Sequence, residues 1–281
     1  MKNQFGIFFL FIGFISLAQN AKADKILAKG KKLFRLEKAS WYSTDYFLAD
    51  YPDKRDSIGG YLSYEKNGKV YSIYYNRHDK NRILARYVFD SIPARKHQVE
   101  LNLKATPEEA DLITLRDDAI QKVYANEDGF FQFFEKTSFN FVPVIENNIK
   151  QVYILTGPKI YGVVLIGNDY LLTYNKKNKL KKKEKLHNSL LEFPYKFEEG
   201  DKNEGNKKME MTMHSHIVTD LITETDICTL LLYKDFVEWD HHLVMSKKYV
   251  SIFDLEEESL QVMKTKDWKK LAKAVKEQNK K

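Results

Sequence analysis

The sequence predicts an α+β fold, in which helices flank a mixed, largely antiparallel sheet and a helix lies near each end of the chain. Short runs of β-branched and aromatic residues between residues 61 and 103, separated by turn residues, are typical of antiparallel strands. Apolar residues at helical spacing in residues 24–50, 106–123 and 223–233 indicate helices. Aromatic residues make up 14% of the chain, which provides enough apolar surface for a packed core and excludes a disordered protein.

The first half of the chain is expected to begin with a helix over residues 24–50. A β-hairpin follows over residues 61–64 and 70–75, because the Asn-Gly pair at 67–68 favours the tight turn that joins antiparallel strands. Two further strands are expected at residues 82–90 and 99–103.

A capping box predicts where the next helix begins. Thr106 can accept a hydrogen bond from the backbone of Glu109, the Glu109 side chain can bond back, and Pro107 suits the first helical position. Apolar runs after this helix predict strands at residues 130–144, 152–155, 161–166 and 170–174. The last part of the chain is expected to hold an alternating strand at 209–216, the helix at 223–233 and a strand pair at 243–253.

Positive charge gathers in two places, and the formal net charge is +7. The densest run, residues 176–185, lacks the interleaved aromatic residues that favour nucleic-acid binding. We interpret it as a hairpin tip or an exposed edge strand, where lysine discourages aggregation. The second place is the C-terminal helix, in which Trp268, Leu271 and Val275 form a narrow apolar stripe. We expect this helix to dock by that stripe and to present a basic outer face.

Residues 1–19 have the features of a signal peptide. Lys2 is the only charge before residue 22, residues 5–17 are apolar but short for a membrane span, and small residues surround a cleavage point after Gln19. This segment resembles the signal peptides of Bacteroidetes bacteria. We therefore expect an exported protein, periplasmic or secreted, with no membrane span after cleavage; an uncleaved anchor is the alternative. A lipoprotein would need a cysteine at the cleavage point, where none is present.

The expected mature chain, residues 20–281, has no internal repeat, and no strong break occurs between residues 61 and 263, which favours a single α+β domain. Cys228 is the only cysteine, and this excludes both an intramolecular disulfide and a cysteine-based zinc cluster. It lies in an apolar helical run, so we expect it to be packed rather than reactive. Any metal site must therefore use histidine and carboxylate ligands.

Such a site is indicated by His214-Ser-His216 and, after a short loop, Thr223-Glu-Thr-Asp226. Residues i and i+2 of a strand point to the same face, so the two imidazoles can meet one metal at one edge of a sheet. Asp226, at the start of the next helix, can provide a third ligand. Three protein ligands and a water form the open geometry of catalytic zinc.

These residues resemble the core motif of the JAB/MPN family, the JAMM metalloproteases, which is His-x-His-Pro followed by Ser-x-x-Asp at the start of a helix. The resemblance implies that His214, His216 and Asp226 are zinc ligands and that Thr223 takes the place of the serine that helps to position the transition state. It also implies a glutamate earlier in the domain as general base. Glu146, which precedes the strand at 152–155, is the first choice, and Glu192 and Glu210 are the others.

The sequence departs from the family pattern in three ways. Ile217 follows the second histidine in place of proline, Thr223 replaces serine, and the loop between the two parts of the motif is about one residue shorter. The resemblance extends over residues 140–263 and implies a divergent relative. The chain as a whole resembles uncharacterised exported proteins of Bacteroidetes, which imply no activity.

A purely structural interpretation explains the same residues. Thr223 and Asp226 also form a capping signature, with a negative charge in the first turn, where it is favourable. His214 and His216 would then be exposed residues on the polar face of a half-buried strand. Two functions follow from the two interpretations. The first is an exported, non-catalytic binding or structural module, and the alternative is a zinc-dependent peptidase that acts on a peptide or protein through metal-bound water.

Overall fold

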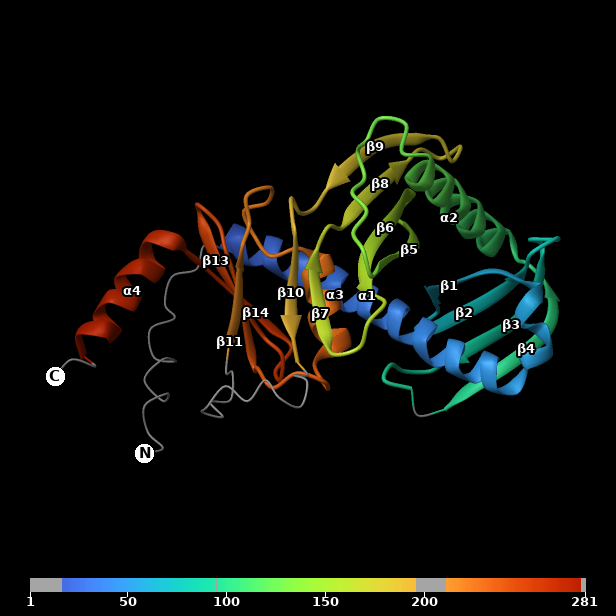
Figure 1. Ribbon diagram of the computed structural model, residues 1–281, viewed down its shortest axis with the longest axis horizontal. Helices are drawn as coiled ribbons and strands as arrows, with labels where there is room; N and C mark the ends of the chain where they lie inside the picture. Colours follow the sequence, from blue (N-terminus) through green and yellow to red (C-terminus); the bar gives the residue numbers. More distant parts are fainter. Residues whose placement is uncertain (1–16, 95, 196–210, 279–281) are drawn as a thin grey trace.

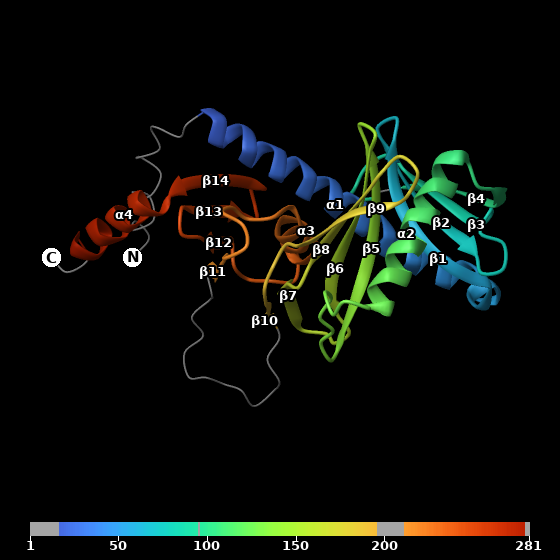
Figure 2. The same cartoon turned by 90° about the horizontal axis from the view of Figure 1, so that it is seen from above.

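A computed structural model of the chain describes residues 17–94, 96–195 and 211–278. Four small sheets lie along a long helix, α1 (Leu17–Asp50), which crosses most of the molecule (Figures 1 and 2). All but one of the strand pairings are antiparallel. The predicted α+β class, with a helix near each end, is confirmed.

The first sheet is an antiparallel meander that follows α1 and a short 3-10 helix (Pro52–Ser57). Its strands are β1 (Ile58–Lys66), β2 (Lys69–Asn76), β3 (Arg82–Phe89) and β4 (His97–Lys104). The predicted hairpin is confirmed, because β1 pairs with β2 through a turn in which Asn67 and Gly68 have φ values of 51° and 76°. Both residues favour the positive φ that such a turn needs.

Helix α2 (Pro107–Ala125) begins at the predicted capping box, with Thr106 as N-cap and Glu109 as its partner. The Glu109 carboxylate is fully buried, and both its oxygens accept hydrogen bonds of 2.8 Å from the Arg86 guanidinium. Tyr64 donates a further bond of 2.9 Å. This bidentate ion pair ties the start of α2 to the first sheet.

The second sheet has the order β5-β6-β8-β9. Its strands are β5 (Thr137–Glu146), β6 (Ile149–Pro158), β8 (Tyr170–Tyr174) and β9 (Leu180–Lys185). The lysine-rich β9 is an edge strand, as predicted for that run. The expected strand at 130–144 begins only at Thr137, because Asn126 ends α2 in the left-handed conformation and its side chain bonds twice to the backbone of Phe131, which holds a loop.

The third sheet lies near the middle of the molecule beside α3, and the fourth lies beyond it on the side of α4 (Figure 1). The third pairs β7 (Val163–Gly167) with β10 (Leu190–Pro194). The fourth comprises β11 (Met211–Ser215), β12 (His241–Met245), β13 (Tyr249–Asp254) and β14 (Ser259–Lys264). Strand β11 lies parallel to β12 at the edge of this sheet, and α3 (Glu224–Tyr233) lies in the connection between them.

One hydrophobic cluster includes residues of all four sheets together with α1 and α3. Cys228 is fully buried within it, as expected. Gly30 of α1 faces α3 so closely that a Cβ there would lie 2.6 Å from the side chain of Ile227. The long N-terminal helix therefore packs against the helix that carries one of the predicted ligands.

The C-terminal helix α4 (Thr265–Gln278) is docked by its first turns only, and not along the whole predicted stripe. Thr265 is buried and Trp268 and Leu271 are half-buried, whereas Val275 is exposed and the outer turns project beyond β14 (Figure 1). Within the described residues, no helix has both the length and the apolar character needed to cross a bilayer. Most of the predicted signal peptide (residues 1–16) and the predicted loop at 198–208 lie outside the described residues. The predicted cleavage point after Gln19 falls within the first turns of α1, and cleavage there stays a prediction.

Candidate metal centre

Four buried side chains converge between the third and fourth sheets: His187, His214, His216 and Asp226. One ligand atom of each lies within 4.8 Å of the corresponding atom of every other. His214 belongs to β11, His216 follows it directly, and Asp226 lies in the first turn of α3. The three ligands expected from the sequence are therefore brought together, and a fourth histidine joins them.

His187 comes from the segment between β9 and β10, which a glycine holds in place. Gly167, at the end of β7, has a φ of 108°, and a Cβ there would lie 2.2 Å from the carbonyl oxygen of Ser189. The backbone N–H of Asn168 donates to that carbonyl at 3.0 Å. Only glycine allows this approach, and the approach positions the turn that carries His187.

The distances between ligand atoms are close to those of a four-coordinate site. His187 Nε2 and Asp226 Oδ1 are 2.8 Å apart, and the Nε2 atoms of His214 and His216 are also 2.8 Å apart. His216 Nε2 lies 3.4 Å from Asp226 Oδ2. Tetrahedral zinc with nitrogen and oxygen ligands separates neighbouring ligand atoms by about 3.4 Å, so small side-chain rotations suffice to admit an ion.

Hydrogen bonds to groups outside the cluster orient the imidazoles of His214 and His216. His216 Nδ1 donates to the carbonyl oxygen of Leu221 at 2.9 Å. His214 Nδ1 lies 2.7 Å from Nε2 of His242, whose Nδ1 lies 2.7 Å from the hydroxyl of Thr212. Such outer contacts fix the orientation and tautomer of metal-binding imidazoles.

Asp226 is held by the start of its own helix. Its Oδ2 accepts hydrogen bonds from the backbone N–H and the hydroxyl of Thr223, both at 2.8 Å, while Thr223 Oγ1 accepts from the Asp226 N–H. The predicted capping box is thus confirmed, and it leaves Oδ1 pointing at the imidazoles. Capping and metal binding are therefore compatible uses of the same residues.

The structure contradicts the expectation that the histidine pair is exposed. His214 and His216 are each 6% exposed, whereas Met211 and Met213 on the opposite face of β11 are 39% and 54% exposed. Burial alternates along the described part of this run, residues 211–216, but the polar face is the inner one. It turns inward because the polar groups of Thr212, His214 and His216 all find hydrogen-bond partners there.

His187 has an incomplete outer contact. Its Nδ1 is buried and has no hydrogen-bond partner among the described residues, and the nearest carboxylate oxygen, Asp169 Oδ2, is 3.6 Å away. The other oxygen of Asp169 accepts from the backbone N–H of Thr156 at 2.8 Å. A small rotation of the imidazole would complete an Asp169–His187 pair, the carboxylate–histidine arrangement common behind zinc ligands.

Charge in the cluster is divided between an ion pair and neutral imidazoles. Burial acts to lower the pKa of His187, but the Asp226 carboxylate outweighs it and raises that pKa to about 9. Burial lowers the pKa of His214 to about 4 and that of His242 to about 3, and it also lowers the pKa of His216. Burial acts to raise the pKa of Asp226, but the neighbouring histidines hold it well below its usual value. Of the three histidines in the cluster, His214 and His216 are thus uncharged, as metal ligands must be, whereas His187 carries a proton that a metal ion would have to displace.

A cavity of about 90 Å³ is lined in part by His187, His214 and His216. Its rim includes Ile217 and Val218, which are 76% and 44% exposed. Asp226 does not line it. The cavity therefore offers a path by which an ion, or a small molecule coordinated to it, can reach the cluster.

The glutamates suggested as general base lie outside this group. Glu146 ends β5, is half exposed and pairs with Lys32 of α1 at 3.3 Å. Glu192 is an exposed residue of β10, and Glu210 lies outside the described residues. The sequence did not indicate His187, which has no partner at ligand spacing. It did not indicate the contact of His242 with His214 either, because this contact arises from the pairing of β11 with β12.

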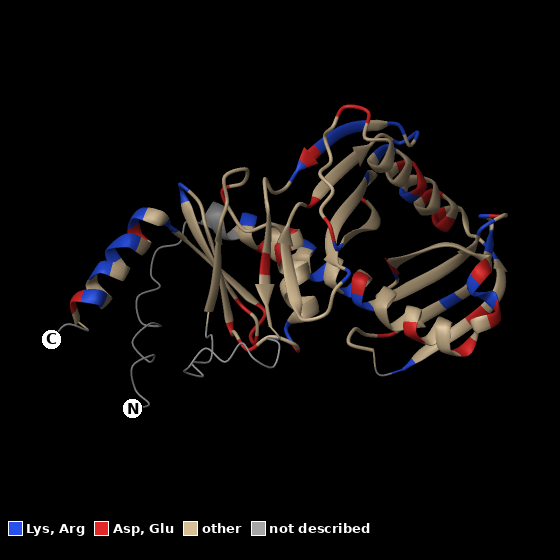
Figure 3. Ribbon diagram, in the orientation of Figure 1, with Lys and Arg blue, Asp and Glu red and all other residues tan. Residues whose placement is uncertain are grey.

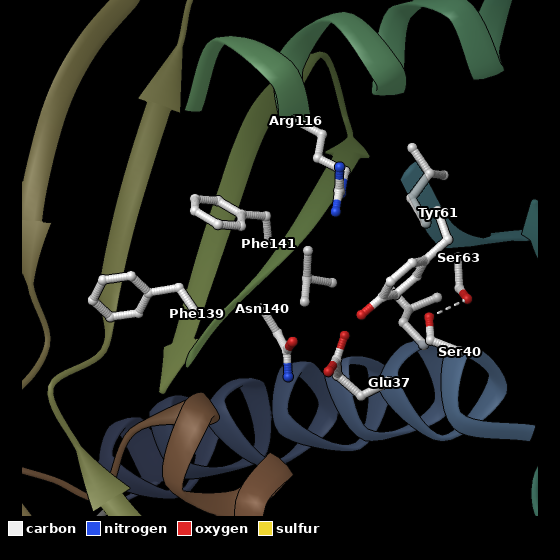
Figure 4. Close-up of a pocket in the computed structure, with 11 residues that line it drawn as sticks. Glu37, Ser40, Tyr61, Ser63, Arg116, Phe139, Asn140 and Phe141 are labelled. Carbon is white, nitrogen blue, oxygen red and sulfur yellow. Dashed lines mark hydrogen bonds between the residues drawn. The ribbon is translucent and has the colours of Figure 1, made fainter. Parts of the chain in front are cut away.

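A second polar cavity, of about 20 Å³, lies between α1, β1, α2 and β5 (Figure 4). Glu37 of α1, Tyr61 of β1 and Arg116 of α2 point into it, beside a buried hydrogen bond of 2.7 Å between Ser40 and Ser63. Glu37 is 6% exposed, and burial raises its pKa to about 7 although Arg116 acts to lower it. A volume of this size holds about one water molecule, so this cavity is too small for an organic ligand.

Comparison of the chain with protein-family models, curated proteins and solved structures found no match.

Proposed function

We propose that this protein is an exported, non-catalytic module that binds one divalent transition-metal ion, with zinc as the first candidate. The convergence of the four buried ligand atoms of His187, His214, His216 and Asp226 carries the proposal. Imidazole and carboxylate together suit zinc and its first-row neighbours, whereas calcium and magnesium prefer sites made of oxygen atoms.

The number of protein ligands supports a non-catalytic role. Four protein ligands are typical of structural zinc, and catalytic zinc usually has three and a water. The ligands come from the β9–β10 segment, from the end of β11 and from α3, so an ion would join the segment that carries His187 to the β11–α3 part of the chain. An ion held in this way stabilises the folded state by its own binding free energy. It would have to displace the proton on His187, which otherwise pairs with Asp226.

Metal analysis of the purified protein tests the proposal. We expect about one ion per chain, and an increase in the melting temperature on adding zinc to chelator-treated protein. His214→Ala and Asp226→Asn should lose the ion, and Asp226→Asn keeps an oxygen that can still cap α3. The matched control is His78→Ala, which removes an exposed histidine outside the cluster. Equal metal content in all four proteins, or none in any, would contradict the proposal.

A JAMM-like zinc peptidase is the second candidate, and the cavity that the three histidines help to line supports it. A substrate carbonyl could approach the ion through it, and the ion would supply a nucleophilic water. The geometry favours this function less, because a fourth protein ligand occupies the place of the water and Glu146 is paired with Lys32. Hydrolysis of an unfolded protein by zinc-loaded protein, lost in both His214→Ala and Glu146→Gln, would favour the peptidase. Absence of hydrolysis by zinc-loaded protein would contradict the peptidase and support the non-catalytic binding module.

A further inference from the structure

Helix α4 is divided lengthwise into a basic and an apolar face. Its lysines lie at intervals of one, three and four residues and therefore on one side of a helix; they are Lys266, Lys269, Lys270, Lys273 and Lys276. The opposite side carries Trp268, Leu271 and Val275. Figure 3 shows lysine along most of the helix, with few acidic residues.

The body of the protein provides little of the packing that usually stabilises such a helix. Trp268 and Leu271 are half-buried, Val275 is 37% exposed, and every described position after Leu271 is exposed. A helix of 14 residues is marginal on its own in water. Its apolar side is thus available for a partner along its outer turns.

The helix projects from the end of the molecule at which α1 begins. Strand β14 leads directly into α4, and Val262 of β14 packs in one small cluster with Ala23 of α1.

We propose that α4 docks on the surface of an anionic phospholipid bilayer and lies in the plane of the interface. Such helices combine low overall hydrophobicity, a lysine-rich polar face and a narrower apolar face. Five lysines against Asp267 and Glu277 give the described helix a net charge of 5 − 2 = +3. That charge suits anionic headgroups, and it repels a second copy of the same helix. This role is independent of the metal site.

Co-sedimentation with lipid vesicles tests the inference. We expect protein lacking residues 1–19 to bind vesicles that contain phosphatidylglycerol several-fold more strongly than vesicles of pure phosphatidylcholine. Binding should weaken several-fold at high salt, since a lysine contact with headgroups is screened. Omission of residues 1–19 ensures that the apolar N-terminal segment does not contribute to binding.

One triple variant and one double variant separate the contributions of the basic and apolar faces to vesicle binding. Lys269→Gln/Lys273→Gln/Lys276→Gln should lose the preference for anionic vesicles, and Leu271→Gln/Val275→Gln should weaken binding to them. The control removes three exposed lysines near β9, as Lys176→Gln/Lys177→Gln/Lys181→Gln, and should bind like the unchanged protein. Circular dichroism and metal content verify that each variant is folded.

Three results would overturn the inference. They are equal binding to neutral and anionic vesicles, equal loss of binding in the β9 control, and concentration-dependent self-association that the α4 variants abolish. The last result would assign the helix to contacts between copies of the chain.

Discussion

The Nε2 atoms of His214 and His216 face each other at 2.8 Å in a buried site. His216 Nδ1 lies 2.9 Å from the carbonyl oxygen of Leu221 and 2.7 Å from the hydroxyl of Thr219. The Thr219 hydroxyl donates its hydrogen to the same carbonyl, which can only accept, so these contacts place the hydrogen of His216 on Nδ1. His216 Nε2 therefore presents a lone pair. Without metal, His214 Nε2–H can donate to it, and the hydrogen bonds then run from Thr212 through His242 to His214. A metal ion needs the lone pair of His214 Nε2. Metal binding would therefore reverse the direction of these hydrogen bonds, so that His214 donates to His242 and His242 donates to Thr212.

His242 should therefore affect metal affinity without touching the metal. His242→Ala removes the acceptor for His214 Nδ1–H, and we expect metal affinity to fall about 10–100-fold, as for other outer contacts of metal ligands. Competition with a chromophoric chelator measures the effect. The neighbouring His241→Ala is the matched control, since His241 does not belong to the cluster and its Nε2 lies 3.4 Å from Asp254 Oδ2. Unchanged affinity in His242→Ala would show that the hydrogen bond to His242 does not hold His214 in the tautomer that binds metal.

His187 determines whether the site has four protein ligands or three. We expect His187→Ala to reduce metal affinity more than His242→Ala does, because it removes a ligand rather than an outer contact. The visible spectrum of cobalt-substituted protein should change as a water replaces the imidazole. An unchanged spectrum and affinity would show that His187 is not a ligand and would restore the open, three-ligand site that the sequence alone predicts.

The sequence predicts those parts of the molecule that depend on local signals. The capping boxes at Thr106 and Thr223 and the turn at Asn67 each combine residue types within a few positions, and each is confirmed. The His214–His216 spacing belongs to the same class, which is why the sequence indicates three of the four clustered residues. His187 joins them because the backbone of Gly167 lies close to the Ser189 carbonyl, and the spacing of residues in the sequence does not predict that contact.

Local patterns fail where tertiary packing decides which face of an element is buried. The alternation along β11 does not predict which face of the strand is buried. The face with the histidines is buried because β12 and residues 219–221 provide hydrogen-bond partners for it. The stripe on α4 indicates an amphipathic helix but not what covers it. Docking on the body was a reasonable expectation from periodicity, and the described residues provide little surface for it.

Gly167 should be intolerant of any side chain. Gly167→Ala would place a Cβ against the Ser189 carbonyl and would force alanine into a positive φ, so we expect a loss of about 1–3 kcal/mol of unfolding free energy. Metal affinity should also fall, because the His187 segment must shift. Gly129→Ala is a matched control, with a φ of 64° and nothing within 4 Å of the new Cβ. Urea unfolding and chelator competition measure the two effects, and equal losses in both variants would show that the close approach is unimportant.

Glu37 should make the protein less stable as the pH rises. Burial raises its pKa from 4.5 to about 7, so the folded state holds a proton that the unfolded state has released over this interval. The favourable contribution is fully present below pH 4.5 and is lost as the pH rises through 7. A shift of this size corresponds to about 3 kcal/mol.

Glu37→Gln isolates this contribution, since glutamine has nearly the same shape and does not titrate. Relative to the unchanged protein, the variant should gain about 3 kcal/mol of unfolding free energy between pH 4.5 and pH 8. Urea unfolding at several pH values measures the difference, and the exposed Glu127→Gln serves as the reference for loss of one charge. If the difference in unfolding free energy between Glu37→Gln and the unchanged protein does not vary with pH, Glu37 is ionised in the folded protein. Arg116, which faces the same cavity, would then be the cause, because a guanidinium close to a carboxylate favours its charged form.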